Sequence, residues 1–305
     1  MRVSIIGSNG MLSVALAKYF YAKSDCIVDV YGLDYPNGYE FENFYQINLL
    51  ETKLDYDNLL FSDVIIYASG AGVQAALSTD SSLMYALNVN IPIEITLQLK
   101  KRGYKGKYVS FGSYMEIGLN SEEGKAFTED EVVCSELPIT NDYGLSKRLY
   151  SRYMNELMAD YSYLHFILPN MFSEEDKKQG TRLVPYTLNY LQDYRAGHKN
   201  ADPCFSAGLQ TRQFITLEEM TQTIDKTLEK NIPSGLYNIG GGEYLSIRSL
   251  IERLFAIYEI PCKDEFFGQE VRRDGDIKSL RIDGSKLYKE IGVLPSSTIE
   301  KIFTI

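Results

Sequence analysis

The sequence predicts an α/β protein with a doubly wound parallel sheet and a smaller C-terminal lobe. Two observations predict this class. Over the first 170 residues, short apolar runs of strand length alternate with helical patterns, whereas after Asn170 helical stretches dominate and the strands between them are short. Alternation of strand and helix implies right-handed crossover connections, which lay parallel strands side by side in one sheet.

The elements of the first part follow in chain order. Apolar runs bounded by glycine or polar residues predict strands, and amphipathic stretches predict helices. We expect strands at 2–6, 27–33, 43–47, 63–68, 107–112 and 163–168, and helices at 11–23, 81–102 and 143–160. Together they define a domain over residues 1–170.

The second part reads as a smaller lobe. Helical stretches are predicted near 182–196, 217–229, 246–258 and 284–291. We expect 171–213 and 241–305 to form this lobe and 214–240 to return to the first domain. The acidic stretch from Asn120 to Asp142 is expected to be a solvated loop, with a role as a lid as the alternative.

Composition excludes several classes of partner. The net charge of the 305 residues is −10 and no long basic run occurs, which argues against nucleic acid. No apolar stretch is long enough to span a bilayer, and no signal peptide is recognisable, so we expect a cytoplasmic protein without a membrane partner. The four cysteines are widely spaced, as free thiols in a reducing compartment would be.

A metal site built from histidines is excluded as well. His165 and His198 are the only two histidines. His165 lies in the apolar run 163–168, where a core or strand residue is expected rather than a ligand. We therefore predict no metal.

The first strand leads into a glycine turn that suits a dinucleotide. Gly7, Asn9, Gly10 and Met11 lie between that strand and the first helix. Glycines allow the backbone to approach a pyrophosphate, and the helix N-terminus offers free N–H groups and a positive dipole end. The alternative is a glycine turn in an ordinary α/β protein.

The second strand ends near an acid, Asp34. A carboxylate there can accept hydrogen bonds from both ribose hydroxyls of an adenosine and repels a 2′-phosphate. No Arg or Lys lies between Val28 and Phe44 to bind that phosphate. The sequence therefore predicts NAD rather than NADP. The small residues Ala68, Ser69 and Gly70 follow the fourth strand, at the sheet edge where ligands bind in such folds.

Tyr143 and Lys147 stand four residues apart in a predicted helix, on one face and one turn from each other. A phenol beside an ammonium is a paired acid, because the cation stabilises the phenolate and should lower the pKa of the phenol. Such a pair suits the interconversion of an alcohol and a carbonyl. Tyr and Lys at this spacing are also common on helix surfaces, so the pair by itself leaves a surface role open.

With these features the chain resembles the extended short-chain dehydrogenase/reductases, the NAD-dependent epimerase/dehydratase family that acts on nucleotide sugars. Its glycine turn resembles the family's TGxxGxxG, with Ser13 at the third glycine, and YxxxK is intact at Tyr143 and Lys147. The segment Val109 to Gly118 resembles the family's GSxxEYG. The resemblance implies a Rossmann sheet, a cytoplasmic NAD enzyme, and a catalytic hydroxyl on Ser113.

The resemblance also implies further binding residues. Asn88 matches a helix asparagine that supports the active site, and Asn48 stands where many members carry an Asp near the adenine. Asn170, in Leu168-Pro169-Asn170, resembles the asparagine that contacts the nucleotide sugar. Arg212 and Arg273 match two arginines that contact its diphosphate, and paired guanidiniums suit that group.

The chain departs from the family pattern at several positions. Tyr114 and Met115 occupy the place where 4,6-dehydratases carry Asp and Glu as acid and base. Neither side chain replaces that pair, which argues against dehydration. Ile167, Gln213 and Glu218 replace the usual Arg, Asp and Asp, which leaves the placement of the substrate open.

Hydride transfer at C4 of a nucleotide-linked hexose is therefore the predicted reaction. The Gly112-Ser113-x-x-Glu116 form and the Gly208-Leu209-Gln210-x-Arg212 segment resemble those of deoxysugar ketoreductases of surface-polysaccharide pathways, and this resemblance favours a 4-ketoreductase. The alternative is a 4-epimerase that retains NAD, and a non-catalytic dinucleotide sensor is a third possibility. The resemblance further suggests a homodimer through the helices near 81–102 and 143–160, although these faces could also only cover the sheet.

Overall fold

The computed structural model describes residues 1–35, 41–72, 80–173, 182–198, 201–270 and 277–303. Within these ranges, seven parallel strands form one sheet in the order β3-β2-β1-β4-β5-β6-β9. The predicted α/β fold with a doubly wound parallel sheet is confirmed. The strands are β1 (Arg2–Ile6), β2 (Ile27–Gly32), β3 (Asn43–Gln46), β4 (Val64–Tyr67), β5 (Lys107–Ser113), β6 (Ser162–Leu168) and β9 (Gly235–Asn238).

Helices cover both faces of this sheet. One face packs against α1 (Met11–Tyr21), α8 (Leu217–Lys230) and α10 (Ser285–Ile291). The other packs against α2 (Tyr56–Leu59), α4 (Ile91–Lys101) and α6 (Asp142–Asn155). In β1, Val3 and Ile5 face the first layer and Ile6 faces the second, the alternation expected of a strand buried on both sides.

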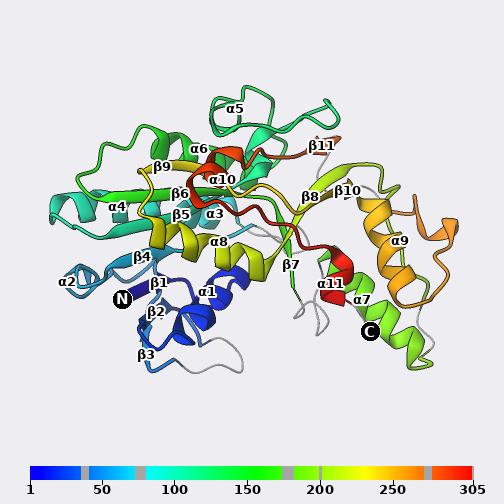
Figure 1. The fold of residues 1–305 in the computed structure, drawn as a ribbon, viewed down its shortest axis with the longest axis horizontal. Helices are drawn as coiled ribbons and strands as arrows, with labels where there is room; N and C mark the ends of the chain where they lie inside the picture. Colours follow the sequence, from blue (N-terminus) through cyan, green and yellow to red (C-terminus); the bar gives the residue numbers. More distant parts are fainter. Residues whose placement is uncertain (36–40, 73–79, 174–181, 199–200, 271–276, 304–305) are drawn as a thin grey trace.

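A smaller lobe lies beyond the ends of β7 and β8 (Figure 1). Its sheet contains β10 (Glu243–Ser246), β8 (Thr211–Thr216), β11 (Ser279–Leu280) and β7 (Asn170–Phe172), the last paired with β8. Three helices share its separate apolar core: α7 (Leu183–Arg195), α9 (Ile247–Ile257) and α11 (Ile299–Phe303). Although β9 and α8 follow β7 and β8 in the chain, they lie on the large sheet.

The expected helix over 81–102 is interrupted. It consists of α3 (Ser81–Tyr85), a π-helical turn η1 (Ala86–Asn90) and α4. Pro92 stands at the first turn of α4, where its missing N–H and its ring disturb the preceding α-helical hydrogen bonds. Single π turns of this kind occur often at functional sites.

The acidic stretch is more ordered than expected. It contains α5 (Glu129–Val133), which begins at Thr128 with a capping box: Thr128 and Glu131 each bond the other's backbone N–H. Val132 and Val133 are buried. The interpretation of this whole segment as a solvated loop is therefore wrong, because the Thr-x-x-Glu spacing starts a helix whose apolar side reaches the core.

The structure also bears on the predictions made for the cysteines and for membrane spans. The four cysteines are free thiols, as predicted. None of the helices in the described part of the chain is long and apolar enough to cross a membrane.

Candidate active site

The turn after β1 packs directly against the end of β4. Gly7 has a φ of +126°, and a Cβ at this position would lie 2.9 Å from the backbone of both Ala68 and Ser69. Its N–H donates to the carbonyl of Tyr31 over 2.8 Å. Only glycine fits this position, so the predicted cofactor segments 7–11 and 68–70 form one surface at the carboxyl edge of the sheet.

The N-terminus of α1 is open to an anion. Gly10 is the N-cap, no side chain caps the helix, and its first turn contains no acidic residue. Ser13, at the family's third glycine, is buried and donates its hydroxyl to the Gly10 carbonyl over 2.9 Å. The Ser13 side chain is therefore accommodated within the turn.

Ser8 connects this turn to the predicted adenosine site. Its hydroxyl donates to the backbone carbonyl of Asp34 over 2.6 Å. A Cβ on Gly32 would lie 2.0 Å from the Ser8 Oγ, so a glycine is needed at the end of β2. Asp34 itself is exposed two residues beyond the strand. Neither Ser8 nor Gly32 was predicted, because their importance depends on a contact between two strand ends.

Asn48 follows β3 and is half-buried. Its side-chain oxygen accepts the N–H of Leu50 over 3.1 Å, so this residue shapes its own turn. A direct contact of Asn48 with an adenine stays a prediction.

Asn88 is buried in the π turn and binds three protein groups. Its oxygen accepts the N–H of Ala71, and its nitrogen donates to the Ala71 carbonyl and to the Ser146 hydroxyl, each over 3.0 Å. A Cβ on Gly70 would lie 3.0 Å from the Asn88 oxygen and 3.9 Å from Lys147 Nζ. Asn88 thus ties the loop after β4 to α6. The role in supporting the active site that the family resemblance implies for it stays a prediction.

Ser113 is the last residue of β5 and the N-cap of the short helix η2 (Tyr114–Ile117). Glu116 completes a capping box there, since its carboxylate accepts the N–H of Ser113 over 2.6 Å. The Ser113 hydroxyl accepts the N–H of Met115 over 3.3 Å. This local structure fixes Ser113 where β5 meets α6.

Tyr143 and Lys147 lie on the first turns of α6, which Asn141 caps by accepting the N–H of Gly144. Burial raises the pKa of Tyr143 to about 12, and the nearby Glu116 charge adds to this, whereas a hydrogen bond with the Ser113 side chain opposes it. The prediction that Lys147 lowers the phenol's pKa is wrong for these residues, because burial dominates and the Lys147 ammonium donates to the carbonyl of Phe111 over 2.9 Å.

Burial also affects Lys147 and lowers its pKa to about 8, while the Glu116 charge acts in the opposite direction. The Lys147 ammonium lies close to Gly70 and donates a hydrogen bond to the β5 backbone. The fold brings Ser113, Tyr143, Lys147 and Gly70 to one place at the sheet edge, beside the turn at Gly7.

Two of the predicted substrate residues, Asn170 and Arg212, lie in the smaller lobe. Asn170 opens β7 and pairs with Phe214 of β8, two residues from Arg212. Arg212 is buried, and its guanidinium donates to the carbonyls of Thr211 over 2.7 Å and Ile277 over 3.0 Å. Arg273 lies outside the described residues.

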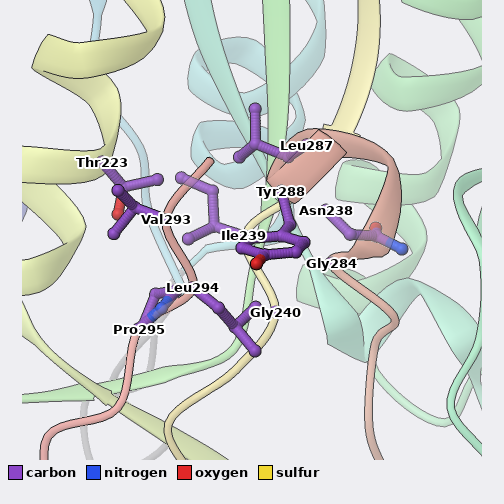
Figure 2. A pocket seen from close by; sticks show the side chains of 10 residues that line it. All are labelled: Thr223, Asn238, Ile239, Gly240, Gly284, Leu287, Tyr288, Val293, Leu294 and Pro295. Carbon is purple, nitrogen blue, oxygen red and sulfur yellow. The ribbon is translucent and has the colours of Figure 1, made fainter. Parts of the chain in front are cut away.

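A small pocket lies elsewhere, between α8, β9, α10 and residues 293–295. Figure 2 shows its lining, which includes Thr223, Ile239 and Tyr288. The space of about 160 Å³ between these residues includes open solvent, so they enclose no cavity of the kind that holds a ligand. None of the residues predicted for catalysis or binding lines it, so we do not assign it a ligand.

A family model described as "NAD dependent epimerase/dehydratase family" matches residues 3–240. The chain belongs to this family. It is therefore an enzyme of a family that uses NAD, and the predictions of family, enzyme and cofactor are confirmed. No curated protein matches the chain in sequence.

Solved structures share its fold at low identity. A dTDP-glucose 4,6-dehydratase from Bacillus anthracis in complex with NAD has a TM-score of 0.78 and 16% identity, with 99% of this chain and 94% of that chain covered. The Bordetella bronchiseptica enzyme WbmG, in complex with NAD and UDP, has a TM-score of 0.74 and 17% identity, with 99% of this chain and 92% of that chain covered. RMD from Pseudomonas aeruginosa, complexed with NADPH, has a TM-score of 0.75 and 18% identity, with 99% of this chain and 96% of that chain covered.

Proposed function

We propose that this member of the family is a nucleotide-sugar oxidoreductase that acts at C4 of a nucleotide-linked hexose, as a 4-ketoreductase of a deoxysugar pathway. The observation that carries the proposal is the convergence of Ser113, Tyr143 and Lys147 beside the glycine turn. Solved structures of similar fold contain UDP or UDP-glucose together with NAD, which supports a nucleotide sugar as the substrate class.

The residues for NAD fit the group. Gly7, Asn9, Gly10 and Met11 would bind the diphosphate at the α1 N-terminus, which has no competing acid or side-chain cap. Asp34 and Asn48 would contact the adenosine, and Ala68, Ser69 and Gly70 would line the remainder. Bound NADH supplies a hydride to a carbonyl carbon, and the protein supplies binding, orientation and the proton.

The proton for that reaction would come from Tyr143. Burial raises its pKa to about 12, so the phenol is protonated near neutral pH and can donate to the C4 oxygen as the carbonyl is reduced. Ser113 would hydrogen-bond the same oxygen. Lys147 would hold the nicotinamide ribose and supply positive charge as the phenolate forms.

The smaller lobe would anchor the substrate. Asn170 and Arg212 lie on neighbouring strands, and Arg273 would add a second guanidinium to the diphosphate. Binding energy from this remote group would then orient the sugar ring. Tyr114 and Met115, at the dehydratase acid and base positions, argue against loss of water.

A 4-epimerase is the second candidate, because it needs the same three residues and Asp34 accepts NAD. The deciding experiment mixes the enzyme with a nucleotide-4-ketosugar and NADH and follows NADH absorbance. Stoichiometric loss of NADH is expected. Interconversion of two nucleotide sugars without added reductant would contradict the proposed reductase and identify an epimerase.

A dinucleotide sensor would bind the cofactor and perform no chemistry. Tyr143→Phe separates the cases, because it removes only the proton donor. We expect turnover to fall by a factor of about 10²–10⁴ while NADH affinity is retained. Full activity in this variant would remove Tyr143 as the acid.

We also propose a homodimer through α4 and α6. Leu97 of α4 and Leu145 and Leu149 of α6 are exposed by 53%, 38% and 43%. A second copy would cover these side chains in a four-helix interface. Sedimentation of the purified protein measures this directly, and a monomer at all concentrations would refute it.

A further inference from the structure

A chain of buried polar groups lies behind Ser113. Glu116 is fully buried, and one of its oxygens accepts the Ser113 N–H over 2.6 Å. Ser151 of α6 lies against the same carboxyl group and contacts His165 Nε2 over 2.7 Å. The other ring nitrogen, Nδ1, contacts the Ser110 hydroxyl over 2.8 Å. Ser110, Ser151 and His165 are all fully buried.

Gly112 allows these groups to meet. A Cβ on Gly112 would lie 2.5 Å from Glu116 Oε1 and 2.9 Å from both His165 Nε2 and Ser151 Oγ. The backbone of β5 therefore passes directly over the point where three side chains converge. A carboxyl group placed there in the interior is costly unless it is bound, and its second oxygen, Oε2, is buried without a hydrogen bond among the described residues.

Charged groups surround Glu116 unevenly. On α6, Lys147 and Arg148 favour its charged form, and Arg148 also donates to the Glu116 and Ile117 carbonyls. On β6, burial lowers the pKa of His165 to about 3, so the imidazole is neutral. On α5, Glu129 is bonded to the backbone of Asn238, and its neighbours Asp130 and Glu131 are exposed. β11 also packs on η2 and brings no titratable residue.

We propose that Glu116 is a positioning residue of the active site, which holds Ser113 through its backbone and whose charge biases the proton on the Tyr143–Lys147 pair. The inference rests on the proposed function. Burial raises the pKa of Glu116 to about 7, against hydrogen bonds from Ser151 and Ser113 that lower it. When ionised, Glu116 raises the pKa of both Tyr143 and Lys147.

The test compares Glu116→Gln with Glu131→Gln. Glu131 accepts an N-cap N–H in the same kind of capping box, but on the surface, so it is a matched control. Glutamine keeps an oxygen that accepts this N–H and removes the charge. Both variants should therefore keep their local turn.

The first measurement needs neither cofactor nor turnover: thermal unfolding of the protein alone as a function of pH. Because folding raises the Glu116 pKa from 4.5 to about 7, the native state binds a proton that the unfolded state lacks in this window. Its contribution to stability is present below the unfolded pKa and is lost as pH rises through about 7. Glu116→Gln should remove this loss of stability, whereas Glu131→Gln should keep it. The same loss in Glu116→Gln would overturn the assignment.

The second measurement is the pH profile of turnover. Without the Glu116 charge, the pKa values of Tyr143 and Lys147 fall, so the profile should move to lower pH by about one unit. We expect a lower kcat with an unchanged KM for the nucleotide sugar. A profile that stays in place in Glu116→Gln would reduce this residue to a structural role and overturn the proposal.

Ser151→Ala keeps the inference testable if Glu116→Gln does not fold. This change removes a hydrogen bond that lowers the pKa of Glu116, so the pH-dependent loss of stability should move to higher pH. An unmoved loss would overturn the proposal. If the wild-type protein binds NADH but reduces no nucleotide-4-ketosugar, the proposed function fails separately. The unfolding measurement and the pH dependence of NADH affinity then decide the role of Glu116.

Discussion

Two capping boxes in this chain have the same local structure and opposite chemistry. In both, a hydroxyl residue begins a short helix, and the third residue along is a glutamate that accepts the N-cap N–H, over 2.6 Å in Ser113–Glu116 and 2.9 Å in Thr128–Glu131. The exposed Glu131 has a lowered pKa, chiefly because it accepts that N–H. The buried Glu116 has a raised pKa, because burial outweighs the same hydrogen bond. Sequence spacing therefore sets the turn, and burial sets the charge.

The largest expected effect comes from Ser113→Ala, which removes the hydroxyl of the buried capping box. The backbone half of the capping box is retained, since Glu116 binds the Ser113 N–H. We expect kcat to fall by a factor of about 10² or more, because a hydrogen bond to the reacting oxygen is lost. Steady-state kinetics with a nucleotide-4-ketosugar measures this. Wild-type turnover in Ser113→Ala would place the catalytic hydroxyl elsewhere.

A second change would break the buried box sterically. Gly112→Ala puts a Cβ 2.5 Å from Glu116 Oε1, and the neighbouring side chains are packed on all sides. We expect a loss of about 1–3 kcal/mol in the free energy of unfolding, measured by denaturant titration. Gly103→Ala is a control for the presence of a new methyl group, because a Cβ there meets no atom within 4 Å, although its φ of +70° adds strain. Equal stability of Gly112→Ala and wild type would contradict the close packing.

The smallest effect is expected at the surface box. Thr128→Ala removes an N-cap oxygen and should cost about 1 kcal/mol of stability. Turnover should not change, because α5 lies outside the group of Ser113, Tyr143 and Lys147. Thermal unfolding and kinetics on one preparation test both statements. A loss of turnover in a folded Thr128→Ala would connect α5 to the active site and give support to the lid.

The sequence predicted six of the seven strands that the described residues place in the large sheet, and most of these are apolar runs closed by glycine or polar residues. β9 was expected only as part of the segment 214–240 that returns to the first domain. The sequence also predicted that His165 is a core residue, and it is fully buried in β6. It did not predict the π turn at Asn88 or the helix α5. The first depends on Pro92, which lacks an N–H for the helix, and on hydrogen bonds of the Asn88 side chain to Ala71 in another segment. The second was not recognised because its composition is acidic.

For the site, residue spacing and the family resemblance predicted which residues lie together. They did not predict the direction in which the pKa of Tyr143 is shifted. Tyr143 and Lys147 lie on one face of α6 as expected, yet the pKa of Tyr143 rises instead of falling. The effect of burial on a phenol depends on atoms from several elements, among them Ser113 and Glu116, and no local pattern encodes it. The sequence did not predict the roles of Ser8 and Gly32 for the same reason, since their contact joins the turn after β1 to the end of β2.

The position of β9 determines the order in which the large sheet can be completed during synthesis. β6 ends at Leu168, whereas its edge partner begins at Gly235, so the entire segment with β7, α7 and β8 must leave the ribosome between them. Until then one edge of β6, which contains Leu164 and Phe166, is unpaired, a state open to wrong pairing with other chains. Two strands and one helix of the smaller lobe, β7, β8 and α7, are therefore synthesised before the large sheet can be completed.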